Sequence, residues 1–251
     1  MRSRLSIAMR LRLDTQLVSR GLAESREKAK RLILAGAVRV EGQRAHKPSD
    51  LVEEDAALAV EAAEKYVSRG GHKLEAALNA FHIVCAGLVC ADLGASTGGF
   101  TDCLLQRDAV RVHAVDVGQG QLDWKLRKDS RVVVHDDLNA RHLSVADIGE
   151  MVDLVTIDVS FISLTKILPS AAKILKTGGA IVALIKPQFE AGKKFVKKGG
   201  VVRDSRVHES VKQEIQTFAT DIAGLGLLGI VESPLLGPAG NKEFLIVLRK
   251  P

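Results

Sequence analysis

From residue 72 onwards, short apolar runs alternate with amphipathic segments of helical period. The apolar runs predict strands over 88–93, 110–116, 131–135, 152–158, 179–186, 226–233 and 243–249. The segments between them predict helices over 72–80, 99–106, 120–128, 164–176 and 205–223. Strands that alternate with helices form a mostly parallel sheet with helices on both faces. Because no helix separates the last two strands, the final strand is predicted to enter the sheet antiparallel.

Residues 10–61 follow a different pattern. A first helix is predicted from an apolar stripe made of Leu11, Leu13, Leu17 and Val18. Ser25 is a suitable N-cap for a second helix. The buried face of that helix is expected to hold Ala29, Leu32, Ile33 and Leu34. Alternation at 37–40, a turn at 41–43 and an apolar segment at 55–60 predict a small sheet.

The charge of the chain is concentrated near its start. Residues 1–47 hold twelve Lys and Arg against four Asp and Glu, within a net charge of +6. Such a basic segment indicates a polyanionic partner, although a solvated helical surface would look the same. The expected nucleic-acid contacts in this part are Arg12, Arg20, Arg26, Lys28, Lys30, Arg31, Arg39 and Arg44. Aromatic residues make up only 4% of the chain, which favours recognition of RNA shape and backbone over stacked bases.

A second basic cluster follows the strand expected at 179–186. It consists of Lys193, Lys194, Lys197, Lys198 and Arg203 in a segment that also contains glycines. We expect these side chains to hold phosphates beside a target nucleotide, unless the segment is only a solvated loop.

Other classes of protein are excluded by what the composition lacks. No apolar run approaches the ~18 residues that span a bilayer, and the first ten residues contain no apolar signal core. The three cysteines form no C-x-x-C pair and the histidines form no H-E-x-x-H motif, so neither a disulfide framework nor a metal site is expected. A cytoplasmic protein without a metal fits these observations.

The segment Asp92–Phe100 carries the clearest chemical signal. It places an acidic residue and then glycines between a strand and a helix, as at the cofactor end of a Rossmann-like sheet. The spacing is not G-x-G-x-x-G, and Asp92 would repel a pyrophosphate, whereas S-adenosylmethionine (SAM) carries a sulfonium and an ammonium. We expect SAM to be held by Asp92, Gly94, Ser96, Gly98, Phe100, Asp116 on the ribose, and Asp136 near the adenine, with Asp137 as the competitor of Asp136. The alternative is a strand-to-helix turn whose glycines serve packing alone.

Charged residues also stand at three further strand ends. Asp158 and Lys186 follow two predicted parallel strands, and Glu243 opens the last strand. Ligands gather outside the carboxyl ends of parallel strands, and an antiparallel last strand would begin on that same side. We therefore expect the three charges to converge, although each alone could be an ordinary strand-end charge. Lys73, on the first helix of this part, is less strongly indicated by pattern.

Several motifs resemble those of the TlyA proteins, often labelled haemolysin A. They lie at 68–74, 92–101, 157–164, 184–190 and 240–244, and residues 12–42 resemble an S4 RNA-binding domain. The resemblance implies a small α+β S4 domain over 1–61, a linker over 62–71 and an FtsJ-like domain over 72–251. The second domain would be an α/β, Rossmann-like SAM-dependent methyltransferase sheet with helices on both faces and an antiparallel last strand. Ser96-Thr97 departs from the Ala-Pro that FtsJ enzymes usually have there.

The resemblance also implies an activity, the 2′-O-methylation of a cytidine ribose in ribosomal RNA. The catalytic set of FtsJ-like enzymes then falls on Lys73, Asp158, Lys186 and Glu243. A ribose hydroxyl is a weak acid, so methyl transfer needs a base, for which we expect Lys186. Partial burial and the neighbouring Lys73 would favour loss of its proton, while the two carboxylates oppose it and orient the lysines.

Other functions remain possible at this point. A non-catalytic RNA-binding or ribosome assembly factor could keep a methyltransferase fold, and the haemolysin label suggests a membrane-lytic role. A nucleotide-dependent dehydrogenase is disfavoured by the glycine spacing. The expected partners are ribosomal RNA or ribosomal subunits and no membrane; the pattern contains no information on oligomeric state.

Overall fold

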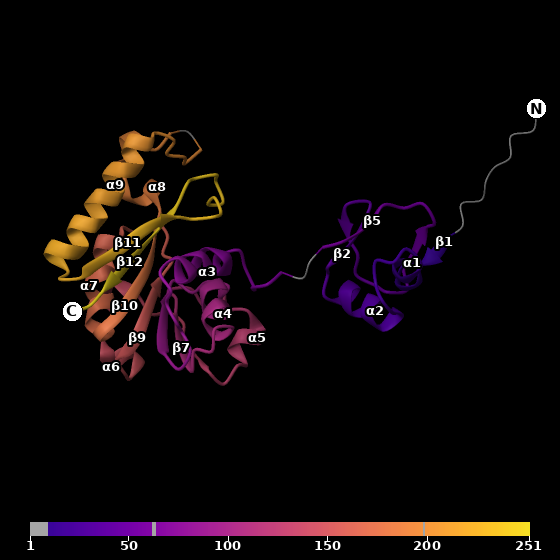
Figure 1. Ribbon diagram of the computed structural model, residues 1–251, viewed down its shortest axis with the longest axis horizontal. Coiled ribbons are helices and arrows are strands. Elements are labelled where there is room, and N and C mark those ends of the chain that lie inside the picture. Colours follow the sequence, from indigo (N-terminus) through magenta and orange to yellow (C-terminus); the bar gives the residue numbers. More distant parts are fainter. Residues whose placement is uncertain (1–9, 62–63, 198) are drawn as a thin grey trace, which may run out of the picture. The chain divides into compact units, whose positions relative to one another are not determined.

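The computed structural model describes residues 10–61, 64–197 and 199–251 (Figure 1). Its contacts divide the chain into a first unit that ends at Lys65 and a second unit, Tyr66–Pro251. Three predicted features lie partly or wholly outside the described residues: positions 1–9 of the first domain, positions 62–63 of the linker, and Lys198.

The first unit packs two helices against short strands. The helices are α1 (Leu13–Ser19) and α2 (Arg26–Leu34). The strands are β1 (Arg10–Arg12), β2 (Val38–Val40), β3 (Gln43–Arg44), β4 (Leu51–Glu53) and β5 (Leu58–Val60). Strand β2 pairs antiparallel with β3 and β5, and β1 pairs antiparallel with β4. Leu13, Leu17 and Ile33 lie in the core that these elements enclose.

Two sequence predictions for this unit were wrong. Residues 10–12 form a strand and not the start of the first helix, because β4 supplies a pairing partner that the pattern did not indicate. Leu34 is not on the buried face of α2, since 72% of it is exposed. The face toward the core follows the i, i+4 pair Ala29 and Ile33, and the next residue along a helix is turned by about 100°.

The second unit is built on a seven-stranded mixed sheet. Its strands are β6 (Val89–Leu93), β7 (Arg111–Val115), β8 (Val132–His135), β9 (Val152–Ile157), β10 (Leu175–Ile185), β11 (Gly226–Glu232) and β12 (Phe244–Arg249). They lie in the order β11-β12-β10-β9-β6-β7-β8. Strand β12 is antiparallel to both of its neighbours, whereas β8, β7, β6, β9 and β10 run parallel. The predicted antiparallel last strand is therefore confirmed.

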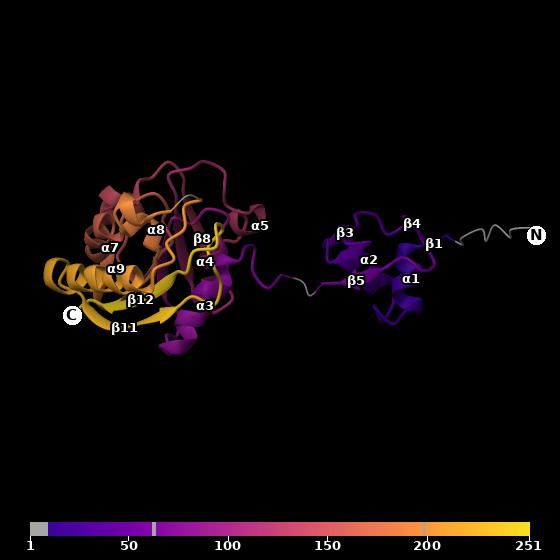
Figure 2. The same cartoon turned by 90° about the horizontal axis from the view of Figure 1, so that it is seen from above.

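Helices cover both faces of this sheet (Figures 1 and 2). The α-helices are α3 (Gly70–Ala80), α4 (Gly99–Leu105), α5 (Trp124–Arg127), α6 (Val145–Ile148), α7 (Leu168–Ile174), α8 (Pro187–Glu190) and α9 (Ser205–Thr217). Short 3-10 turns at Ala140–His142, Leu164–Lys166 and Lys193–Phe195, and a π-helix at Phe218–Ile222, complete the unit.

Alternation along the strands explains the two layers. In β10, Val182 and Leu184 join the core under α3, α4 and α5, while Ile181, Ala183 and Ile185 join the core under α6, α7 and α9. Successive side chains of a strand point to opposite faces, so a strand that is apolar throughout must be covered on both. The sheet is covered in this way.

Element boundaries differ from the predicted ones where local signals are weak. The helices predicted at 120–128 and 164–176 shrink to α5 and α7, and β10 already begins at Leu175. Residues 66–71 were assigned to the linker, but Tyr66 is buried in the second core and Val67 N donates to Asp102 Oδ2 at 2.8 Å. Within the described segments, no helix combines the length and the apolar character needed to cross a bilayer.

Candidate active site

The site lies where the order of the sheet reverses. The chain runs outward from β6 through β7 to β8 and then returns to β9 on the other side of β6. Ligands of open α/β sheets bind at such a switch point, outside the carboxyl ends of the strands. The register pairs Leu93 with both Val115 and Ile157, so the residues that follow these three strands emerge side by side.

The glycine turn after β6 has little space around it. Gly94 has a φ of +84°, and a Cβ at this position would lie 2.7 Å from the backbone oxygen of Asp158. Ser96 also has a positive φ, and its backbone N–H donates to Asp116 Oδ2 at 2.8 Å. The other oxygen of Asp116 accepts from Gly118 N at 2.8 Å. Asp116 therefore orders the turn from the neighbouring strand end, and only glycine fits at position 94.

Asp92 lies beneath the turn and not in the open site. Its side chain is fully buried and accepts hydrogen bonds from Thr101 Oγ1 at 2.7 Å and Thr156 Oγ1 at 2.9 Å. Burial raises the pKa of the carboxyl to about 6, against the opposing effect of the two hydroxyl donors. Asp92 joins α4 to β9, and it does not line the cavities of the site.

Two adjoining cavities of about 460 and 470 Å³ open at this edge of the sheet. Both are lined by Gly94, Ser96, Asp158 and Ser160. The first continues to Phe100, Lys73 and Lys186, and the second continues to Asp116. Each falls in the size range of small-molecule sites, about 300–1,000 Å³.

Gly98 and Asp136 occupy other positions. Gly98, with a φ of +96°, caps α4 and packs against Leu122 and Leu126. Asp136 forms an ion pair with Arg127 at 2.6 Å, and Asp137 accepts a hydrogen bond from Gln119. The second cavity is lined instead by Leu138 and Asn139, which follow in the same segment.

The structure brings the four charged residues together as two ion pairs. Lys73 Nζ lies 2.5 Å from Glu243 Oε2, and Lys186 Nζ lies 2.7 Å from Asp158 Oδ1. Lys73 and Glu243 are buried, Glu243 to all but 1% of its surface. The antiparallel pairing of Ile185 with Phe244 sets Lys186 and Glu243 beside each other at the strand ends.

Other residues at the site were missed by the sequence prediction. Ser160 Oγ accepts a hydrogen bond from Lys186 Nζ at 2.8 Å. Phe161 has a positive φ, is 90% exposed, and places its ring 4.9 Å from that of Phe189. Gly99 lines the first cavity, where a Cβ would meet Ser68 Oγ. In the sequence, the signal that could have identified Ser160 and Phe161 as site residues is their position just after Asp158, in the segment that follows a strand.

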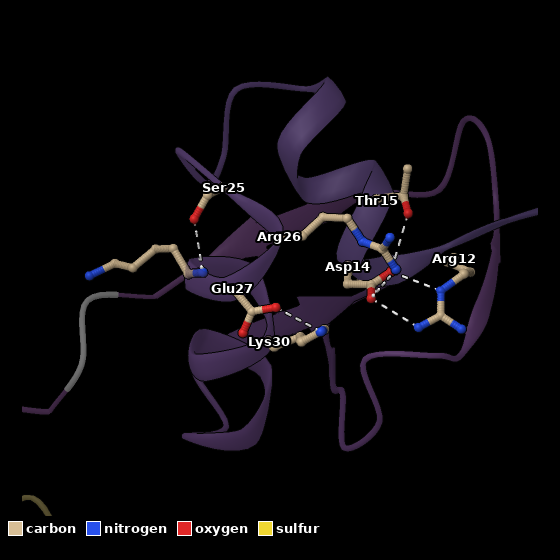
Figure 3. Close-up of polar contacts among 8 residues, drawn as sticks. Arg12, Asp14, Thr15, Ser25, Arg26, Glu27 and Lys30 are labelled. Carbon is tan, nitrogen blue, oxygen red and sulfur yellow. Dashed lines mark hydrogen bonds and ion pairs between the residues drawn. The ribbon is translucent and has the colours of Figure 1, made fainter.

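In the first unit, two of the basic residues, Arg12 and Arg26, bind one buried acid, Asp14 (Figure 3). Asp14 is fully buried, and its carboxylate accepts from Arg12 at 2.9 Å and from Arg26 at 3.1 Å. The hydrogen bond from Arg12, together with Arg26, holds the pKa of the Asp14 carboxyl well below its usual range. Both arginines keep about half of their side-chain surface exposed. Two guanidinium groups are thus fixed in direction and remain accessible.

The remaining predicted RNA contacts divide by their partners. Arg20 donates to the backbone oxygen of Ala56 at 2.6 Å, and Arg44 to that of Gly36 at 2.9 Å. Lys30 and Arg39 pair with Glu27 and Glu61. Across the described part of the chain, no hydrogen bond or ion pair of the side chains of Lys28 and Arg31 is found. In the second cluster, Lys194 Nζ lies 4.9 Å from the centre of the Phe195 ring.

The sheet order and the turn together define a methyltransferase-type α/β fold preceded by a small basic unit. The family model of FtsJ-like methyltransferases matches residues 66–250, and the model of the S4 domain matches residues 11–58. The chain therefore belongs to the FtsJ-like methyltransferase family, and an S4 domain precedes its methyltransferase domain. This confirms the fold class and the family resemblance predicted from the sequence.

Known relatives cover nearly the whole chain. The 16S/23S rRNA (cytidine-2′-O)-methyltransferase TlyA of Mycobacterium tuberculosis is 48% identical over 97% of this chain and 91% of its own length. Hemolysin A of Brachyspira hyodysenteriae is 42% identical over 94% of this chain and 98% of its own. A solved structure of a hemolysin candidate from Streptococcus thermophilus has a TM-score of 0.74 and 44% identity, covering 97% of this chain and 89% of that one.

The raised pKa of Asp92 gives a testable dependence of stability on pH. A carboxyl whose folded pKa of about 6 exceeds its ordinary 3.8 contributes stability that is complete below about pH 4 and is lost as the pH rises through 6. The difference corresponds to about 3 kcal/mol. The side chain of Asp92→Asn stays neutral at every pH. Between about pH 4 and pH 7, the free energy of unfolding of this variant minus that of the wild type should therefore increase by up to that amount. Urea unfolding at both pH values measures this.

The control for that comparison is Asp221→Asn, which changes an exposed carboxylate of the same unit. A constant difference between Asp92→Asn and the wild type over this pH range would show that Asp92 is ionised without cost.

The second prediction concerns Asp14. Asp14→Asn removes the charge that holds Arg12 and Arg26, so we expect the first unit to lose about 1–3 kcal/mol of stability at neutral pH. Hydrogen exchange of the full chain should show faster exchange in residues 10–61 and unchanged exchange in residues 66–251. Asp55→Asn, at an exposed site of the same unit, should leave both unchanged. Equal protection in Asp14→Asn and the wild type would contradict the role given to this carboxylate.

Proposed function

We propose that the protein transfers the methyl group of SAM to the 2′-hydroxyl of a cytidine ribose in ribosomal RNA. The observation that carries the proposal is the pairing of Lys73 with Glu243 and of Lys186 with Asp158. Lys73, Asp158 and Lys186 line a cavity that adjoins one reaching Asp116. The acceptor is proposed from the M. tuberculosis relative, named as a 16S/23S rRNA (cytidine-2′-O)-methyltransferase, and from the S4 domain.

The residues present fit SAM as the donor. Asp116 follows β7 at the position where an acidic residue accepts ribose hydroxyls in nucleoside-binding sheets. The conformation of Gly94 allows a ligand to approach the backbone of the turn closely. Asp116, Asn139 and Leu138 would hold the nucleoside, and the turn around Gly94, Ser96 and Phe100 the methionine part. SAM, when bound, supplies an electrophilic methyl group on a sulfonium.

Lys186 is the proposed base. Its Nζ is held between Asp158 Oδ1 and Ser160 Oγ, and it lines the cavity. In the neutral form it accepts the proton of the ribose hydroxyl as the methyl group is transferred. Positive charge then develops on Nζ beside the carboxylate of Asp158, which stabilises it within a partly buried site. Asp158 thus stabilises the site most after the proton has been transferred to Lys186 Nζ.

Lys73 and Glu243 form a second pair with a different task. Because Glu243 neutralises Lys73 in a buried setting, the pair adds little net charge to the site. The ammonium of Lys73 retains donors for the oxygen of the acceptor ribose, which orients the hydroxyl for in-line attack. Alignment of this kind supplies much of the rate in transfer reactions.

The RNA would be held largely through its backbone. The paired guanidinium groups of Arg12 and Arg26 suit phosphate oxygens, which accept two parallel N–H bonds from arginine. The S4 domain would bind folded ribosomal RNA, and the lysines after β10 would hold the strand beside the target nucleotide. Since the proposed acceptor is ribosomal RNA, we propose that the enzyme works in the cytoplasm.

The function is tested by mapping 2′-O-methyl groups in ribosomal RNA from cells with and without this gene. The expected result is a cytidine methylation that disappears with the gene and is restored in isolated subunits by the purified protein with SAM. Identical maps, with no transfer from labelled SAM to either subunit, would favour a non-catalytic role in ribosome assembly.

The role of Lys186 is tested by substitution. Lys186→Ala removes the base, so transfer of a labelled methyl group to ribosomal subunits should fall by roughly 10²–10⁴-fold. The dissociation constant for SAM, measured by calorimetry, should change less than about threefold, since the nucleoside cavity is untouched. Lys176→Ala is the matched control, because Lys176 also pairs with an aspartate, Asp153. Near-normal turnover in Lys186→Ala would exclude it as the base.

A further inference from the structure

The basic segment Lys193–Arg203, here called the basic loop, lies between α8 and α9 in the chain. The structure describes it except at position 198. It follows Lys186 through the short helix α8. Within it, Gly200 N donates to Lys197 O at 2.9 Å, and Lys197 N donates to Val201 O at 3.3 Å. Val196 lines a cavity together with Phe161 and Phe189. Backbone hydrogen bonds therefore join Lys197 to Gly200 and Val201, and the loop lies next to residues that adjoin Asp158 and Lys186.

A single buried amide holds the far end of this loop. Asn241 is only 1% exposed, and neither of its side-chain contacts is to another side chain. Its Oδ1 accepts from Val202 N at 2.9 Å, and its Nδ2 donates to Gly200 O at 2.8 Å. One acceptor and one donor on the same planar group fix both the position and the direction of the loop backbone. His208 Nε2 donates to Val202 O at 2.9 Å and completes the attachment.

Asn241 is also connected to the start of β12, beside Glu243. The backbone oxygen of Asn241 accepts from Gly237 N at 2.9 Å, in a turn whose Leu236 and Pro238 line the first cavity. Gly237 lies so close to Glu243 that a Cβ there would overlap Oε1. Glu243 follows Asn241 by two residues and binds Lys73. Asn241 thus joins the basic loop, the wall of the cavity and the start of β12, where Glu243 binds Lys73.

We propose that Asn241 is a positioning residue for the acceptor RNA, which sets the basic loop at a fixed distance from the reacting groups. It acts through the exposed cations Lys194, Lys197 and Arg203, which would hold phosphates beside the target ribose. A buried amide with two backbone partners is well suited to this, because losing either partner leaves an unpaired polar group. The inference rests on the proposed function for its substrate. It assigns nothing to Asn241 in SAM binding, since Asn241 lines neither of the two cavities of the site.

The first test separates binding of RNA from chemistry. In Asn241→Ala, the KM for ribosomal subunits should rise about tenfold, because the loop loses two backbone attachments. The kcat should stay within about threefold, and the dissociation constant for SAM should not change. Asn241→Asp keeps the shape of the side chain but loses the donor to Gly200, and should show the same direction if Asn241→Ala folds poorly. Asn79→Ala, which removes a surface amide from α3, is the control. An unchanged KM in both Asn241 variants would overturn the proposal.

The second test asks whether the effect passes through the loop. Replacing Lys194 and Lys197 together by alanine should raise the KM in the wild type. In Asn241→Ala the same replacement should have at most about twofold effect, since a loop held only by His208 no longer presents the two lysines at a fixed position. Fully additive effects would overturn the proposal.

Limited digestion with trypsin gives a readout that does not need activity. Cleavage after Lys194, Lys197 and Arg203 should accelerate about tenfold in Asn241→Ala and not in Asn79→Ala, with the melting temperature little changed. Faster cleavage in a protein that methylates no ribosomal RNA would contradict the proposed function alone. Cleavage at the wild-type rate in both Asn241 variants would contradict the positioning role alone.

Discussion

The carboxylate of Asp92 has no contact with solvent and yet occupies the centre of the methyltransferase unit. It accepts one hydroxyl from α4 and one from β9, on either side of the strand that carries it. Placing a carboxylate in such a position costs several kcal/mol unless donors compensate it. The two threonines offset only part of that cost, since the pKa of Asp92 stays raised, and they anchor the turn at 94–98 against α4 and β9. Gly94 can then approach Asp158, and the two cavities meet at that point.

The four charged residues of the site form two pairs of opposite charge. Two lysines and two carboxylates come from α3, β9, β10 and β12, and each lysine has one carboxylate. A site with a net charge near zero suits a reaction in which a cationic donor and an anionic RNA must both approach. On the proposed function, the polyanion is attracted by surfaces outside the paired charges, in the S4 domain and the basic loop, and not by uncompensated charge within them.

Much of the fold could be predicted from the chain, because burial on both faces leaves continuous apolar strands such as β10. The antiparallel direction of β12 could also be predicted, because no helix separates it from the strand before it. This direction places Glu243 beside Lys186, as the structure shows. Local pattern does not reveal partners that are distant in sequence. Asp92 looks like a ligand-facing acid until Thr156, 64 residues later, is seen to bind it. In the same way, Asp136 forms an ion pair with Arg127. The wall of the second cavity is formed by Leu138 and Asn139. In the S4 domain, β1 is a strand only because β4 lies beside it.

The insertion of β12 between β10 and β11 has a consequence for how the protein matures. Lys73 and Glu243 are 170 residues apart, so their pair can form only once the last strand lies beside β10. Contacts of such long range form late and slowly in folding. The S4 domain has its own core and needs none of them. A folding intermediate without β12 would therefore keep the S4 domain but lack the ion pair between Lys73 and Glu243.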